Sequence, residues 1–171
     1  ESLRFASDNY SKSKAYTHIG KVLIDQGKKK ESHEAMKESL RFASEINDAT
    51  TKSWAYANIS KILMEQGDKE SSLRVAREIT EDWRNSKSKA YANLSKILME
   101  QGAKEESLRI ASEITDEHSK SKAYANLSKI LMEQGAKEES LRIASEITDE
   151  HSKSKAYANL SKILMEQGAK E

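Results

Sequence analysis

One unit of 33 residues occurs twice in this chain without a single change. Residues 86–118 have the sequence SKSKAYANLSKILMEQGAKEESLRIASEITDEH, and residues 119–151 repeat it letter for letter. Residues 152–168 begin a third copy, and drifted copies of the same stretch lie at 14–27 and 54–67. A unit of this size cannot bury its apolar face alone, so such units are stable only when they stack on their neighbours. The repeat therefore predicts an array of stacked units.

One tyrosine marks the register of the copies. It recurs at Tyr16, Tyr56, Tyr91, Tyr124 and Tyr157, with spacings of 40, 35, 33 and 33 residues. The first spacing reflects a seven-residue insertion within residues 27–39, and the second reflects two extra residues near residue 84. Identical copies indicate either a recent duplication of a gene segment or an engineered array. We expect one repeat array over residues 1–171, divided into 1–10 (second helix only), 11–49, 50–85, 86–118, 119–151 and 152–171 (first helix only).

Each unit is expected to form two antiparallel helices. In residues 86–101 the apolar side chains fall at positions 90, 91, 94, 97 and 98, which is the spacing of an amphipathic helix. Gly102 stands where a left-handed residue ends a helix, and a second helix is predicted over residues 105–115. Ser119 is predicted to cap the next helix. No proline and 33% charged residues suit helices. The predicted fold class is all-α, an α-solenoid or superhelix of stacked helix-turn-helix repeats.

The composition excludes several classes of protein. The 29 basic and 28 acidic residues give a net charge of +1, which argues against binding a polyanion through bulk charge. Without cysteine there are no disulfides, thiolate metal sites or cysteine nucleophiles. Apolar runs reach only three or four residues, so no membrane span is predicted. Residues 1–4, ESLR, do not have the pattern that opens a signal peptide, so none is expected. The compartment stays unassigned, and a cytoplasmic location is compatible with these features.

The unit of residues 86–118 carries an ordered set of an aromatic, a leucine, a small, a large, a glycine and a small residue, at Tyr91, Leu94, Ser95, Leu98, Gly102 and Ser107. In this set the unit resembles the tetratricopeptide repeat, a helix pair of 34 residues. Gly20 of the first unit supplies the glycine that this family prefers where later units have serine. Through Tyr91, Asn93 and Leu94 the unit also resembles the related pentatricopeptide repeat.

A polar stripe runs along the first helix of each unit. On a helical wheel, Asn93, Lys96 and Glu100 fall within about 40° of Lys89. In tetratricopeptide arrays these positions line a concave groove, so the resemblance implies a ladder of groove residues that includes a methionine at its edge. The candidate groove residues are Lys14, His18, Lys21, Trp54, Asn58, Lys61, Met64, Lys89, Asn93, Lys96, Met99, Lys122, Asn126, Lys129, Met132, Lys155, Asn159 and Lys162.

The implied groove predicts an interaction scaffold without enzymatic activity. In residues 86–118 the groove positions carry a charge of +1 and the second helix carries −3, so an acidic peptide or a C-terminal carboxylate is the expected ligand. The pentatricopeptide likeness offers RNA as an alternative partner. Against RNA stand the length of 33 residues and a charge of −1 for each complete copy.

No motif of an enzyme or of a cofactor site occurs in the sequence. Phosphate-binding loops, metalloprotease helices and nucleophile elbows are absent. Asp116, Glu117 and His118 adjoin in a turn, but a metal site needs ligands that converge in space, so we predict no metal, no cofactor and no catalytic residue.

The two ends of the sequence complement each other. The letters of residues 168–171 followed by those of residues 1–4 reproduce residues 102–109. Stacking of one molecule on the next is therefore the second functional hypothesis, a self-associating structural repeat. The residues expected at the two ends of such a stack are Leu3, Phe5, Leu160, Ile163 and Leu164.

Overall fold

A computed structural model of the chain describes residues 2–80 and 85–168, with side chains from residue 8 onward. Every regular element within these residues is an α-helix. The chain divides into two compact units, residues 1–90 and residues 91–171. None of the described helices is both long and apolar enough to span a bilayer.

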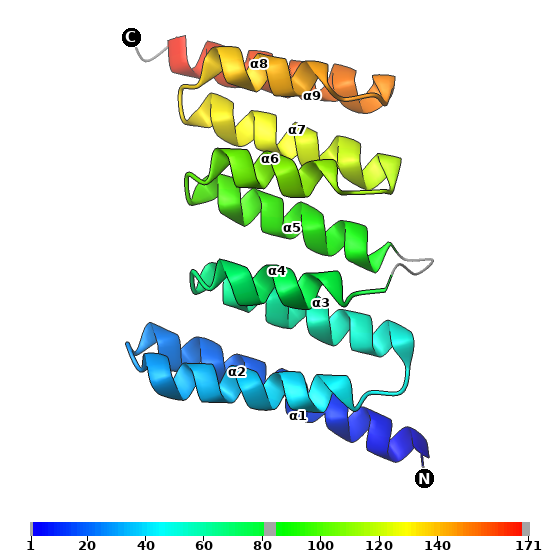
Figure 1. The fold of residues 1–171 in the computed structure, drawn as a ribbon. Coiled ribbons are helices and arrows are strands. Elements are labelled where there is room, and N and C mark those ends of the chain that lie inside the picture. The colour runs from blue at the N-terminus through cyan, green and yellow to red at the C-terminus, as the bar shows by residue number, and fades with distance from the viewer. Residues whose placement is uncertain (1, 81–84, 169–171) are drawn as a thin grey trace. The chain divides into compact units, whose positions relative to one another are not determined.

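The first unit contains two helical hairpins and the start of a third (Figure 1). Its helices are α1 (Ser2–Asp25), α2 (Lys29–Ser44), α3 (Ala49–Glu65), α4 (Lys69–Arg77) and the first turn of α5 (Ser86–Glu100). Helix α1 packs against α2 and α3, and α3 packs in addition against α4. Helix α2 has 16 residues and α4 has 9, so the seven-residue insertion lengthens a second helix.

The second unit continues the same pattern. It contains the rest of α5, then α6 (Lys104–Ser112), α7 (Glu117–Glu133), α8 (Lys137–Ser145) and α9 (Glu150–Gly168). Helix α7 packs against α6, α8 and α9, and α8 packs against α9. The expected all-α solenoid of consecutive helix pairs is confirmed inside each unit.

Glycine and aspartate set the ends of the helices. In four hairpins the first helix ends at a glycine with a left-handed backbone, at φ values from 76° to 84°, as the sequence predicted. The fifth glycine expected at such an end, Gly168, lies within α9. Aspartate caps several helix starts, and the carboxylate of Asp116 accepts a hydrogen bond from the amide of Ser119 at 2.8 Å. The prediction of Ser119 as the cap was therefore wrong. A carboxylate at Asp116 also interacts favourably with the positive end of the helix dipole.

Helix α1 runs without a break through the boundary that was expected after residue 10. Ser2 precedes Tyr16 by 14 positions, whereas the equivalent Ser107 precedes Tyr124 by 17, so the first copy lacks the three residues that make the turn. In residues 86–118 this turn is formed by residues 113–116, between α6 and α7. At the corresponding place in α1 there is no glycine or proline that would interrupt the helix. A separate second helix at residues 1–10 is thus not formed.

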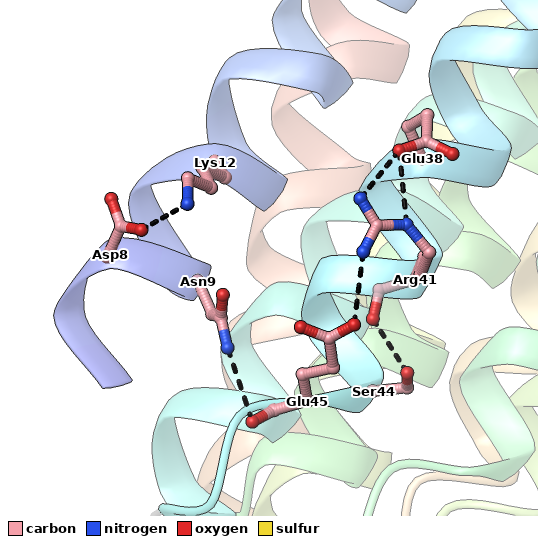
Figure 2. A network of polar contacts seen from close by, with 7 residues as sticks. All are labelled: Asp8, Asn9, Lys12, Glu38, Arg41, Ser44 and Glu45. Carbon is pink, nitrogen blue, oxygen red and sulfur yellow. Dashed lines mark hydrogen bonds and ion pairs between the residues drawn. The ribbon is translucent and has the colours of Figure 1, made fainter. Parts of the chain in front are cut away.

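A polar contact ties the added length of α1 to the residue that follows α2 (Figure 2). The side-chain amide of Asn9 donates to the carbonyl oxygen of Glu45 at 3.5 Å, which is a long hydrogen bond. Arg41 binds Glu38 at 2.8 Å and Glu45 at 3.1 Å, and its guanidinium carbon lies 4.0 Å from the ring centroid of Phe42. The Asn9 contact joins α1 to the end of α2, whereas the Arg41 contacts lie within α2 and its last turn.

A buried serine joins the two helices of every hairpin. Its hydroxyl donates across the hairpin to a backbone oxygen 12 positions earlier, at distances from 2.6 to 2.8 Å. In the first hairpin the accepting oxygen belongs to Gly20, whereas in the other hairpins it belongs to a serine. A Cβ on Gly20 would lie 2.7 Å from the sulfur of Met36. The four bonds run from Ser32 to Gly20, from Ser72 to Ser60, from Ser107 to Ser95 and from Ser140 to Ser128.

Candidate functional site

A cavity of about 220 Å³ lies between α1 and α3 in the first unit. Five of the candidate groove positions lie in its wall, three on α1 and two on α3. Apolar and hydroxyl side chains complete the lining. The lining residues are Tyr10, Ser13, Lys14, Thr17, His18 and Lys21 of α1, and Ala55, Asn58, Lys61 and Ile62 of α3.

Helical spacing brings these side chains to one surface. Lys14, His18 and Lys21 are separated by four and three residues, so they lie on one face of α1. Asn58 and Lys61 are three residues apart on α3, and all five are exposed. Because α1 packs against α3, the two polar stripes lie along the same cavity.

Hydroxyl groups form the part of the wall that is closest to α2. The hydroxyls of Thr17 and Ser39 are 2.7 Å apart, and Ser39 donates to the carbonyl oxygen of Ser13 at 2.8 Å. These buried groups satisfy one another, so they do not require a ligand. The exposed polar side chains of the lining are the three lysines, His18 and Asn58.

The lining contains three lysines and a histidine but no carboxylate. Glu65 stands next to the lining, 4.0 Å from the amino group of Lys21 and 3.7 Å from that of Lys61. Exposed ion pairs of this kind contribute little. Lys14 forms no ion pair with any residue that the structure describes. The cavity consequently favours a negatively charged group near Lys14.

The remaining lysine and asparagine candidates lie on the first helices of the later repeats. All of them are exposed, and one lysine in each repeat lies 3.6 to 3.9 Å from a glutamate one turn later. Trp54 is 39% exposed on α3 and does not line the cavity. The exposed positions are Lys89, Asn93 and Lys96 on α5, Lys122, Asn126 and Lys129 on α7, and Lys155, Asn159 and Lys162 on α9.

The methionines expected at the groove edge are core residues instead. Met64, Met99 and Met132 are each 0% exposed, so they offer no surface to a ligand. Met132 packs with Ala144 of α8 and Leu160 of α9. The helical wheel placed these side chains beside the polar stripe, but for Met132 the helices α8 and α9 cover the side chain.

Sequence reasoning missed several residues of the cavity wall. Tyr10 was assigned to a separate half repeat, and it lies on α1 with the other lining residues only because the turn expected after residue 10 is missing. Thr17 and Ile62 each adjoin a predicted residue, His18 and Lys61, and would have been found by extending the stripe by one position.

The positions expected at the ends of a stack have different surroundings. Leu160 was expected to be exposed at the end of the array, and this was wrong, because it is 1% exposed and belongs to the core. Ile163 and Leu164 are partly buried against this core. The side chains of Leu3 and Phe5 lie outside the described residues.

A second cavity of about 220 Å³ lies in the other unit between α7 and residues 146–148. There, burial raises the pKa of Tyr124, with a further contribution from the charge of Glu146. The buried hydroxyl of Ser121 has no hydrogen-bond partner, and the hydroxyl of Thr148 donates to Glu117. In the first unit the hydroxyl of the equivalent serine lies 3.2 Å from that of the equivalent threonine.

The helix pairs place the chain among the all-α helical-repeat proteins. Comparison with protein families adds the type of repeat, since the tetratricopeptide repeat family model matches residues 13–45, which include the second half of α1 and all of α2. This match supports a tetratricopeptide-like repeat family, and repeats of this family generally mediate protein–protein interaction. No curated protein and no solved structure matches the chain significantly. Among the described residues, no group of three or more histidine, aspartate or glutamate side chains converges to hold a metal ion.

Proposed function

We propose that this protein is a non-enzymatic scaffold that binds an acidic peptide segment in the cavity between α1 and α3. The observation that carries the proposal is the lining, which combines three lysines and His18 with Tyr10 and Ile62 and contains no carboxylate. A carboxylate of the peptide lies near Lys14 and Lys61, and an adjacent aliphatic side chain contacts the apolar wall. Asn58 donates to and accepts from the peptide backbone, as an amide side chain can do both.

Fluorescence anisotropy with labelled peptides of alternating leucine and glutamate tests the proposal. One peptide ends in a free carboxylate and its partner ends in an amide, so the pair shows whether the C-terminal charge is used. We expect Lys14→Glu or Lys61→Glu to weaken binding by about tenfold or more, since a hydrogen bond to a charged group contributes about 1.5–3 kcal/mol.

Lys37→Glu serves as the matched control. Lys37 is exposed on α2, away from the cavity lining, and carries the same change of charge. Equal weakening by Lys37→Glu and Lys14→Glu would indicate a general effect of net charge and would contradict the proposed site. Single-stranded RNA is included as a second probe, and tighter binding of RNA than of either peptide would replace the peptide as the ligand class.

A further inference from the structure

Helices α7 and α9 have the same sequence but different surroundings. Residues 117–135 and residues 150–168 are identical, so any difference in exposure comes from what packs on them. Met132 of α7 is 0% exposed and Met165 of α9 is 73% exposed. Tyr124 is 8% exposed and its equivalent Tyr157 is 36% exposed.

The cover of α7 shows which helix fits this surface. Both α8 and α9 pack against α7, and Met132 lies in a core with Ala144 of α8 and Leu160 of α9. The buried residues of α8 are Ser140, Ile143 and Ala144. The hydroxyl of Ser140 donates to the backbone oxygen of Ser128 at 2.6 Å. On α9 the residue equivalent to Ser128 is Ser161, which is exposed. The face of α9 therefore has the shape and polar groups of a surface that accepts a helix with the α8 sequence.

The chain itself contains such a sequence in its first residues. Residues 1–7 are ESLRFAS and residues 139–145 of α8 are ESLRIAS, which differ only where Phe5 replaces Ile143. The three buried positions of α8 correspond to Ser2, Phe5 and Ala6. The backbone of α1 is helical from Ser2, as a covering helix requires.

Charge also favours this occupant. Lys104 of α6 binds Glu139 of the next second helix, α8, at 2.9 Å. Lys137 occupies the position of Lys104 one repeat later and forms no ion pair with a described residue. Glu1 has the sequence position of Glu139, so a docked second copy brings a carboxylate toward Lys137.

We propose that the exposed face of α9, formed by Tyr157, Leu164 and Met165, is the docking site for residues 1–7 of a second copy of this chain. The contact is head to tail. It leaves the α9 face of one copy and the first residues of the other available, so that further copies add in the same way. This surface is separate from the cavity between α1 and α3 and does not depend on the proposed peptide binding.

Two variants that each remove one side of the contact test the proposal. Met165→Glu alters the α9 face, and Phe5→Glu alters the covering segment. Light scattering on the unaltered protein is expected to give a mass that rises above 19.3 kDa with concentration. Each variant alone is expected to stay at 19.3 kDa, and a mixture of the two is expected to form a complex of twice that mass and nothing larger.

Glu166→Gln is the control on the same helix, because the equivalent Glu133 stays exposed when α8 covers α7. It is expected to associate like the unaltered protein, and circular dichroism checks that all variants keep their helix content. A synthetic peptide with the sequence of residues 136–148 is expected to return the unaltered protein to particles of one chain with bound peptide, whereas the same peptide with Ile143→Glu is not. A protein that is monomeric at every concentration overturns the proposal. So does a Met165→Glu variant that still associates, a mixture of the two variants that stays monomeric, or a peptide that does not compete.

Discussion

Where α1 and α2 cross, a small residue on one helix faces a large residue on the other. Gly20 faces Met36, which is 2% exposed and packs in a core with Ala43 and Ile59. The other three hairpins have serine at the position of Gly20, and alanine stands four residues after their bonding serine, where Met36 stands in the first hairpin. The two positions have therefore changed together, and the volume at the crossing is shared differently in the first hairpin.

Gly20→Ser is expected to destabilise the protein although serine is the better helix former. The new side chain meets Met36, whose burial leaves it little room to move, and overpacking of this kind costs about 1–3 kcal/mol. The gain in helix propensity is only about 0.5 kcal/mol, so the clash prevails. Urea denaturation measures the free energy of unfolding.

The double variant Gly20→Ser with Met36→Ala supplies the control, because it recreates the pair found in the other hairpins. Met36→Ala alone is expected to cost about 2–5 kcal/mol through the cavity that it leaves. The double variant is expected to be more stable than the sum of the single changes by on the order of 1 kcal/mol. Strictly additive effects would show that the two residues do not share this space.

At the start of α9, the pKa of Asp149 is held below its usual range by hydrogen bonds from the hydroxyl and the amide of Ser152. A carboxyl whose pKa is lower in the folded state stabilises that state above its unfolded pKa, and the contribution is lost as the pH falls through the folded pKa. Asp149→Asn keeps an oxygen that caps the helix but cannot titrate. The melting temperature of the unaltered protein is therefore expected to fall more between pH 7 and pH 3 than that of Asp149→Asn. An equal fall in both proteins would assign the pH dependence to other groups.

At the scale of the element, the sequence predicts most of each helix because the repeat constrains it several times. The apolar spacing in residues 86–101 and Gly102 give α5 and its end within one residue. The second helices end earlier than predicted, at Ser112 for α6, since residues 113–115 form the turn before Asp116. That turn is also what the first copy lacks, so comparison of the copies contained the evidence for a continuous α1.

The candidate site could be predicted only in part for a related reason. A helical wheel finds the exposed stripe of Lys14, His18 and Lys21, because exposure follows from polarity along one helix. It cannot tell which apolar neighbours of the stripe are covered, since this depends on helices from other parts of the sequence. Met64 and Ile62 are both apolar residues of α3, yet Met64 is in the core and Ile62 lines the cavity.

At the scale of the whole molecule, repeats that share one sequence differ in how deeply their side chains are buried. The chain has five methionines, at positions 36, 64, 99, 132 and 165. The first four are 0–2% exposed, and Met165 is 73% exposed. Oxidation of methionine by peroxide requires access to the sulfur, so a buried methionine reacts only when its region opens.

In dilute solution, Met165 is expected to be oxidised more than ten times faster than Met132. Both follow the sequence SKIL, so their intrinsic reactivity is the same and the ratio of rates reports the opening of the hairpin around Met132. An opening free energy above about 1.4 kcal/mol is enough to give this ratio. Peptide mass spectrometry after timed exposure to peroxide measures both rates, after cleavage with a protease that leaves distinct peptides from the two copies. Equal rates would mean that the cover provided by α8 and α9 does not persist in solution, because identical sequences can differ only through their surroundings.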